Sequence, residues 1–213
     1  MPPESGCLIA FEGTEGAGKS TQVKRAAQAL RRDGHRVEIT SEPGATELGQ
    51  RLRELLLHAR DAEPVPLAEL FLYLADRAQH VAQMIAPALS AGAVVLTDRF
   101  SASTIAYQGY GRGLPLESVR ALDASARRGL APALTVLLDC PVADGLARAR
   151  GRSTPGDRFE REATAFHERV RAGFLELAGG EPGRFLVVDA TAPIAAVQAR
   201  VAAEVERRLG RAI

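Results

Sequence analysis

Residues 13 to 20 combine the residue types that hold a chain of phosphates. The stretch reads GTEGAGKS and fits the pattern G-x-x-x-x-G-K-[ST] without deviation. Its glycines let backbone N–H groups converge on phosphate oxygens, a lysine can bridge the β- and γ-phosphates, and a hydroxyl can hold Mg²⁺. The motif therefore predicts a site for a nucleoside triphosphate, formed by Gly13, Thr14, Glu15, Gly16, Ala17, Gly18, Lys19, Ser20 and Thr21.

A carboxylate at the end of a neighbouring strand would complete a magnesium site with Ser20. Three apolar runs end in aspartate, at Asp98, Asp139 and Asp189, so this cue alone does not select one of them. We favour Asp98 because Arg99 follows it, which places a carboxylate and a guanidinium together at one strand end. The chain has no N-K-x-D guanine-reading motif, which disfavours a signalling GTPase.

The elements that must position these residues alternate between strands and helices. Apolar runs without polar alternation predict buried parallel strands at residues 7–12, 37–40, 93–97, 134–138 and 185–188. Apolar residues at helical spacing predict helices over 20–33, 48–56, 66–90, 116–128, 142–150, 160–178 and 193–209. The pattern predicts an α/β fold of three layers, with a five-stranded parallel sheet flanked by helices and ligands at the carboxyl ends of the strands.

Length and composition predict a single soluble domain over residues 1–213. The chain is 46% hydrophobic and 25% charged, and no apolar stretch approaches the ~18 residues that span a bilayer. It begins without the basic and apolar regions of a secretory signal, so we expect a cytoplasmic protein without a membrane role. A net charge of +1 argues against a nucleic-acid partner. Cys7 and Cys140 are expected to be reduced, buried thiols.

Five segments carry a resemblance to a known family, in its order and at its spacings. They read FEGTEGAGKST, SEPGATELGQRLRELLL, ELFLYLADRAQH, DRFSASTIAYQGYGRG and DRFERE. Together they resemble the bacterial type of thymidylate kinase, one of the P-loop nucleoside monophosphate kinases, over about residues 7 to 190. The fourth segment is specific to this family, whereas the P-loop is not.

The resemblance implies ATP and Mg²⁺ as cofactors, dTMP as the acceptor, dTDP as the product and a homodimer. Two alternatives stay open. The chain could phosphorylate another monophosphate such as dUMP, or it could be a non-catalytic ATP-binding regulatory protein with the same P-loop. The second alternative would not need the DRF segment or the arginines near residue 150.

Transfer of a phosphoryl group to a monophosphate needs cations that position the two anionic substrates. It needs no general base, because the acceptor phosphate is already a nucleophile near neutral pH. The resemblance accordingly implies catalytic roles for Lys19 and Arg99, with Arg99 and Arg53 on the acceptor phosphate. It implies that Tyr107 excludes a ribose 2′-hydroxyl and that Glu15 lies near the 3′-hydroxyl or the metal. The implied base contacts are stacking by Phe71, donation to thymine O4 by Arg77, and a pocket lined by Ser103, Thr104 and Gln108.

Phe71 has a competing interpretation. It stands in the apolar stretch LFLYL and, by pattern alone, is typical of a core residue. Six positions separate it from Arg77, so the two do not share one stripe of a helix. Tyr107 and Arg53 would likewise pass for a partly buried tyrosine and a solvated charge.

Residues 148–161, RARGRSTPGDRFER, contain five arginines with glycine and proline between them. The stretch could be a solvated basic loop. The resemblance instead implies a lid that closes over ATP and supplies the arginine that this P-loop lacks. Arg148 and Arg150 match best and Arg152 is a plausible substitute, and the sequence does not separate them.

The sequence departs from the family pattern in one loop. Residues 41–46 read SEPGAT where the family often has R-E-P-G-G-T, so one arginine expected near the acceptor is missing. Arg36 or Arg51 could compensate for it, or this arginine is not essential.

Overall fold

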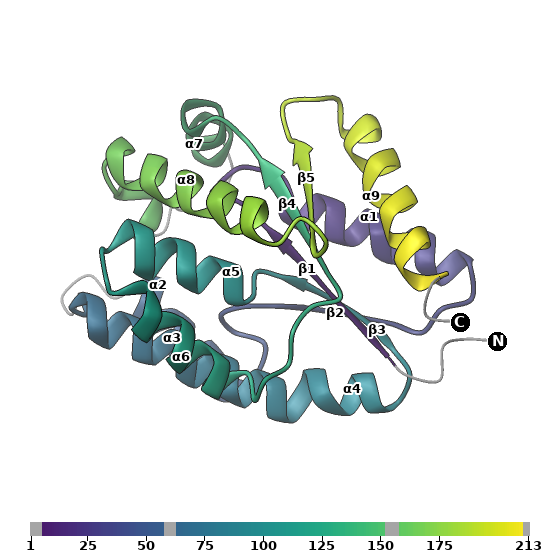
Figure 1. Ribbon diagram of the computed structural model, residues 1–213, viewed down its shortest axis with the longest axis horizontal. Helices are drawn as coiled ribbons and strands as arrows, with labels where there is room; N and C mark the ends of the chain where they lie inside the picture. Colours follow the sequence, from purple (N-terminus) through teal and green to yellow (C-terminus); the bar gives the residue numbers. More distant parts are fainter. Residues whose placement is uncertain (1–5, 58–62, 152–157, 211–213) are drawn as a thin grey trace.

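A parallel β-sheet runs through the middle of the computed structural model, which describes residues 6–57, 63–151 and 158–210 (Figure 1). The strand order is β2-β3-β1-β4-β5, in a five-stranded sheet. The strands are β1 (Cys7–Glu12), β2 (Val37–Ser41), β3 (Val94–Asp98), β4 (Leu134–Asp139) and β5 (Phe185–Asp189). The predicted three-layer α/β fold is confirmed, and four of the strands extend one residue further than the apolar runs indicated.

Helices connect the strands and cover both faces of the sheet. The α-helices are α1 (Lys19–Arg32), α2 (Glu47–Leu57), α3 (Pro66–His80), α4 (Ala86–Ser90), α5 (Ser101–Thr104), α6 (Leu116–Ala126), α7 (Val142–Arg150), α8 (Thr164–Gly180) and α9 (Ile194–Leu209). Two π-helical segments, η1 (Val81–Ile85) and η2 (Ile105–Gly111), and a short 3₁₀ turn, η3 (Phe159–Arg161), complete the described elements.

Two predicted helices differ from the observed ones. The helix predicted over 66–90 consists of α3, η1 and α4, and the one predicted over 160–178 begins later, at Thr164. The helical stretch that carries Tyr107 changes from α5 into the π-helical η2, where Arg112 N–H donates to the Tyr107 carbonyl, five residues back. The wider spacing of a π-helix turns side chains that an α-helix would aim elsewhere.

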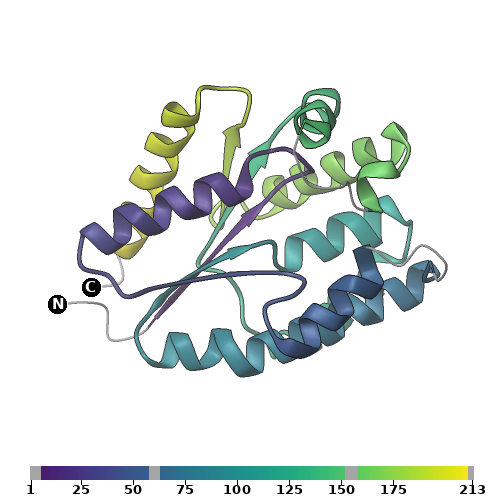
Figure 2. The ribbon, with the colours of Figure 1, turned by 180° about the vertical axis from the view of Figure 1, so that it is seen from behind.

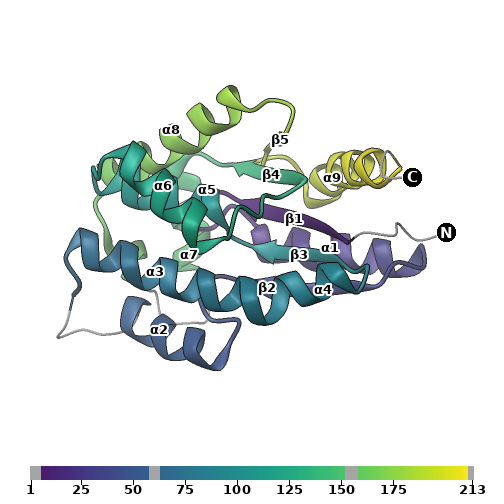
Figure 3. The same ribbon diagram turned by 60° about the horizontal axis from the view of Figure 1, so that its bottom comes forward.

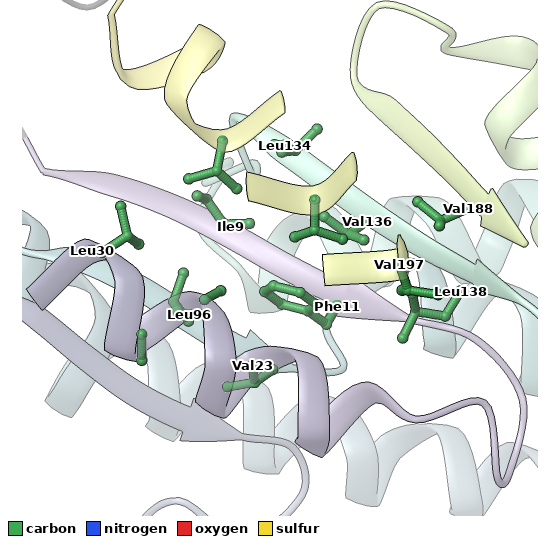
Figure 4. Packing of buried hydrophobic residues seen from close by; sticks show 14 of the residues in the cluster. Ile9, Phe11, Val23, Leu30, Leu96, Leu134, Val136, Leu138, Val188 and Val197 are labelled. Atoms are coloured by element: carbon green, nitrogen blue, oxygen red, sulfur yellow. The ribbon is translucent and has the colours of Figure 1, made fainter. Parts of the chain in front are cut away.

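The strand side chains alternate between two buried layers. Ile9 and Phe11 face α1 and α9, which lie side by side on one face (Figure 2), while Leu8 and Ala10 face the opposite side. Figure 4 shows Phe11 between the sheet and these two helices, beside Val23 and Val197. Because parallel strands are buried on both faces, their sequences lack polar alternation.

Two further expectations concern cysteines and membranes. Cys7 and Cys140 are both free, with Cys140 buried and Cys7 partly buried, and burial raises the pKa of each thiol. Within the described residues, no helix combines the length and the apolar character needed to cross a membrane.

The loop between β1 and α1 packs directly on helix α7. Gly16 has φ +71, a left-handed conformation that glycine adopts without strain, and a Cβ placed there would overlap the carbonyl of Gly145. A Cβ on Gly145 would in turn overlap the carbonyl of Glu15. The close backbone approach fixes the loop against α7, which leads into the residues from 148 onward.

We expect Gly145→Ala to destabilise the protein by about 1–3 kcal/mol, because an added methyl must displace the Glu15 backbone. Gly151→Ala is the matched control at the end of the same helix, where a Cβ would meet its nearest atoms at 3.7 Å. The control should change stability little or raise it by about 0.5 kcal/mol. Urea denaturation measures both, and equal stability of the two variants would contradict the close approach.

Candidate active site

The β1–α1 loop at the carboxyl end of the sheet holds its lysine inward. Lys19 is 8% exposed, and its Nζ donates to the carbonyls of Gly13, at 3.0 Å, and Thr14, at 2.8 Å. Burial and the charge of Arg99 lower the pKa of Lys19 to about 8, although Asp98, Glu15 and Glu12 act in the opposite direction. The ammonium group thus lies inside the loop, where phosphate oxygens could replace the two carbonyls as its hydrogen-bond acceptors.

The predicted triphosphate residues divide into lining and supporting groups. A pocket of about 810 Å³ is lined by Glu15, Gly16, Gly18, Lys19, Ser20 and Thr21 from this loop. Ala17 belongs to the core and Thr14 is buried. The Gly13 carbonyl accepts a hydrogen bond from Lys19 Nζ and so helps to hold the loop. We call this space the donor pocket.

Ser20 and Asp98 meet at the edge of the donor pocket. The Ser20 hydroxyl donates to Asp98 Oδ2 at 2.6 Å. The other two strand-end aspartates are engaged elsewhere, since Asp139 accepts from Arg171 and Asp189 accepts from Thr191. The structure therefore brings together the pair that we favoured from the sequence.

This pair can hold Mg²⁺ only together with other ligands. The described residues contain no group of three or more His, Cys, Asp or Glu side chains placed to bind a metal. Mg²⁺ usually takes one or two protein oxygens and fills its octahedron with water and substrate phosphates. One hydroxyl and one carboxylate beside a phosphate loop fit that requirement.

Arg99 links the P-loop to a second pocket. Its backbone has φ +74 directly after β3, a rare conformation for a side chain of this size. Its Nη1 donates to the Gly13 carbonyl and to Ser103 Oγ, both at 3.1 Å. Its Nη2 donates to Glu15 Oε1 at 3.0 Å and to the Tyr107 hydroxyl at 3.2 Å.

The second space, which we call the acceptor pocket, opens from the donor pocket. It has a volume of about 90 Å³ and shares Glu15, Glu42, Pro43, Arg53 and Arg99 with the donor pocket. Its remaining lining residues are Leu57, Tyr73, Arg77, Ser103, Thr104, Tyr107, Gln108 and Phe159. Eight of the predicted substrate residues therefore surround one space: Glu15, Arg53, Arg77, Arg99, Ser103, Thr104, Tyr107 and Gln108.

Arg77 is buried in the wall of the acceptor pocket with most of its donors occupied. Its Nε and Nη2 donate to Glu42 Oε2 at 2.9 and 2.6 Å, and its Nη1 donates to Thr104 Oγ1 and Asp123 Oδ1 at 2.7 and 2.6 Å. Burial opposes its charge, but the two carboxylates raise the pKa of Arg77 above its ordinary value. One N–H of Nη2 is left, which suits a single acceptor on a ligand.

Phe71 does not line this pocket, which differs from the position expected of a ring that stacks on the base. Its side chain is 52% exposed on α3 and lines neither pocket, nor does it belong to the core. Tyr73 from the same LFLYL stretch lines the acceptor pocket instead. Residues four apart share a face of a helix, so the spacing of Tyr73 and Arg77 was the sequence signal that could have pointed to Tyr73 as the aromatic residue lining this pocket.

The predicted lid arginines separate in the structure. Arg148 lines the donor pocket, and its Nη1 donates to the Ala190 carbonyl at 2.8 Å. Arg150 is exposed and lines neither pocket, while Arg152 lies outside the described residues. The end of the same segment contributes Phe159 to the acceptor pocket, a role that we did not predict although DRFERE was among the recognised motifs.

Neither proposed substitute for the missing loop arginine approaches the acceptor pocket. Arg36 lies 3.9 Å from Glu38 and Arg51 lies 2.7 Å from Glu47, both on the surface. Arg53 lines both pockets, and its Nη1 donates to the Pro43 carbonyl at 2.9 Å. Arg53, on α2, is thus the arginine that lies against this loop at the acceptor pocket.

Two buried carboxylates near the pockets have pKa values shifted in opposite directions. Burial raises the pKa of Glu12 to about 7, although Ser103 Oγ donates to it at 2.5 Å and Phe100 N–H at 2.8 Å. Burial would also raise the pKa of Glu15, but His167, Arg99, Lys19 and the Tyr107 hydroxyl together hold it well below its usual range. Sequence reasoning missed Glu12, the last residue of β1, which lines neither pocket and supports the pocket residue Ser103 from behind.

A P-loop that shares a wall with a second, arginine-lined pocket defines a class of enzyme, the P-loop nucleoside monophosphate kinases. The model of the family described as thymidylate kinase matches residues 11–201 of this chain. The chain belongs to the thymidylate kinase family.

Individual relatives agree with this assignment. The chain is 53% identical to the thymidylate kinase of Geobacter sulfurreducens over 211 residues, which covers 97% of this chain and 99% of the relative. It is 52% identical to the thymidylate kinase of a Synechococcus strain, with 95% of each chain covered. Among solved structures, the crystal structure of thymidylate kinase from Ehrlichia chaffeensis superposes with a TM-score of 0.75 at 30% identity, covering 94% of this chain and 99% of that one.

We expect Glu12 to make stability depend on pH. Its pKa is about 7 in the folded protein against an ordinary value of 4.5, so the folded state binds the proton more tightly. Its stabilising contribution is complete below about pH 4.5 and is lost as the pH rises through about 7. Between about pH 4.5 and 8, the unfolding free energy of the wild type should fall by on the order of 3 kcal/mol relative to Glu12→Gln.

Chemical denaturation at a series of pH values measures this difference. Glu12→Gln is the matched variant because its amide keeps the size of the side chain, can accept from the Phe100 N–H and cannot titrate in this range. Parallel curves for the two proteins across the window would show that Glu12 does not carry a raised pKa.

Proposed function

We propose that this protein transfers the γ-phosphoryl group of ATP to dTMP in the cytoplasm, giving dTDP and ADP on the route to dTTP. The observation that carries the proposal is the continuity of the donor and acceptor pockets at Arg99. Two phosphate-binding spaces that share a guanidinium suit transfer between two bound nucleotides. Neither a hydrolase nor a regulatory ATP-binding protein needs a second pocket of this kind.

The site supplies positive charge rather than a general base. Lys19 would move from its two loop carbonyls to the β- and γ-phosphates, and Arg99 and Arg53 would orient the acceptor phosphate. Arg148 is the lid arginine best placed to approach the transferred group, because it already lines the donor pocket. Ser20 and Asp98 would hold Mg²⁺, whose charge would stabilise the developing charge on the phosphates.

The acceptor pocket suits a thymine base and a deoxyribose. The free N–H of Arg77 can donate to thymine O4, with Ser103, Thr104 and Gln108 around the base. Tyr73, not Phe71, is placed to pack on the face of the base. The Tyr107 ring is 5% exposed and held at its hydroxyl by Glu15, so it can oppose a ribose 2′-hydroxyl from a fixed position.

A homodimer suits the outer surface of α2 and α3. These helices pack side by side (Figure 3) and expose large apolar side chains at helical spacing: Leu48 and Leu55 on α2, and Leu67 and Phe71 on α3. Each of the four is at least 45% exposed in a single chain. Apolar side chains gathered on one surface commonly mark contacts between proteins.

ADP formation with dTMP, dUMP, dCMP and AMP as acceptors tests the function directly. We expect dTMP to be used best, and Lys19→Ala to lower kcat with dTMP by about 10³-fold, which corresponds to about 4 kcal/mol of lost transition-state stabilisation. Arg32→Ala is the control, since this exposed arginine lies in the last turn of α1 and lines neither pocket. No transfer to any of the four acceptors would favour the regulatory alternative, and a better rate with dUMP would change the assigned substrate.

Tyr73 and Phe71 form a matched pair of aromatic residues with different expected roles. Tyr73→Ala should raise KM for dTMP by about tenfold, because stacking on a base contributes about 1–3 kcal/mol. Phe71→Ala should leave this KM within about twofold and weaken self-association in sedimentation measurements. A large rise in KM for Phe71→Ala, with a small one for Tyr73→Ala, would restore the assignment made from the sequence.

A further inference from the structure

Glu69 is a carboxylate buried behind the acceptor pocket with three side chains directed at it. It lies on α3, is 0% exposed and lines neither pocket. Its Oε1 accepts from Gln108 Nε2 at 2.8 Å. Arg112 donates through Nε and Nη2, with Nη2 at 3.1 Å from Oε2, and Arg158 donates through its own Nη2. No contact of Glu69 with a substrate is possible without displacing these partners.

The contact with Gln108 decides which end of its amide faces the pocket. A carboxylate can only accept a hydrogen bond, so it selects the nitrogen end of the amide. Gln108 lines the acceptor pocket, and its Oε1 is the end of the amide that does not contact Glu69. The carbonyl end of the amide is therefore the end that Gln108 can offer to a bound base.

The two arginines hold the end of the lid segment beside the same pocket. The guanidinium carbon of each lies over the Phe159 ring, at 5.5 Å from the ring centroid for Arg112 and 4.8 Å for Arg158. Phe159 is 3% exposed and meets the Tyr107 ring edge-on, with 5.5 Å between the centroids. Arg158 is also tied to α2 by donation from its Nε to the Leu56 carbonyl at 3.2 Å.

We propose that Glu69 is a positioning residue for base selection, which turns the Gln108 carbonyl toward the acceptor base and anchors Phe159 at the pocket. The proposal rests on the proposed function. Thymine presents an N3–H donor beside its O4 acceptor, which matches a carbonyl from Gln108 beside an N–H from Arg77. Cytosine presents the reverse order, an N3 acceptor beside an amino donor, and would place like groups against each other.

A charge at position 69 is needed for both tasks. A glutamine there could donate to Gln108 as well as accept from it, so the Gln108 amide could turn over and present its nitrogen to the base. It would also leave Arg112 and Arg158 without a buried counter-charge, although Arg112 keeps Glu162 at 2.7 Å. Loss of the charge should therefore mainly lower the preference for dTMP over dCMP. It should also weaken the contacts that hold Arg158 and Phe159 at the pocket.

The test compares kcat/KM for dTMP and dCMP in three proteins. In Glu69→Gln, the dTMP-to-dCMP ratio should fall at least tenfold, while KM for ATP stays within twofold of wild type. Arg158→Met is the matched control, because it removes one cation from Glu69 but keeps the contact with Gln108. It should raise KM for dTMP and leave the ratio within twofold.

Glu69→Gln in a Gln108→Leu background separates positioning from general damage. With the amide removed, the second change should not alter the ratio further, whereas a structural effect of Glu69 would lower it again. A folded Glu69→Gln protein with the wild-type ratio overturns the proposal, whatever its thermal stability. Should this variant not fold, Glu69→Asp replaces it, with a smaller expected fall in the ratio, and an unchanged ratio there overturns the proposal equally. A wild-type enzyme that does not prefer dTMP over dCMP would instead refute the proposed function.

Discussion

Arg99 leaves strand β3 in a left-handed backbone conformation, and its guanidinium donates to groups on both sides of the boundary between the two pockets. Its partners include the Gly13 carbonyl of the P-loop and the Tyr107 hydroxyl of η2, which lie far apart in the sequence. These contacts fix the distance between the donor and acceptor sites. A phosphoryl transfer enzyme depends on that distance, because two bound nucleotides react only when the transferred group and its acceptor are in line.

Around this arginine the site balances several buried charges of opposite sign. Lys19 and Glu15 line the donor pocket, while Arg77 lies between Glu42 and Asp123. Breaking such a group by removing one partner leaves an uncompensated charge away from water, which is strongly destabilising. Several hydrogen bonds hold the Arg77 and Glu15 side chains in place. Preorganised charge of this kind is effective in catalysis because it needs no rearrangement during the reaction.

The segment over residues 148–161 contributes residues to both pockets. The segment begins at Arg148, which lines the donor pocket. After residues 152–157, which the structure does not describe, it continues with Arg158 and Phe159 beside the acceptor pocket. One stretch of chain thus touches both nucleotide sites. Arg158 at its far end pairs with Glu69, so in our proposal the contact with the base and the placement of this segment depend on a single buried carboxylate.

Local patterns in the sequence were sufficient for the fold, the P-loop and the family. Apolar runs without alternation determine buried parallel strands, and the glycines before Lys19 determine a phosphate-binding turn, because both depend on neighbouring residues alone. The choice of Tyr73 over Phe71 was decided by which face of α3 lies against the pocket. The positions of Arg36 and Arg51 away from the acceptor pocket likewise depend on how distant segments pack. The same is true of the positions of Glu12 and Glu69 behind the pocket residues. The four-residue spacing of Tyr73 and Arg77 marks a shared helix face in the sequence, but not which face lies against the pocket. Only the tertiary structure brings distant segments together, since burial and charge pairing between them are properties of the packed molecule.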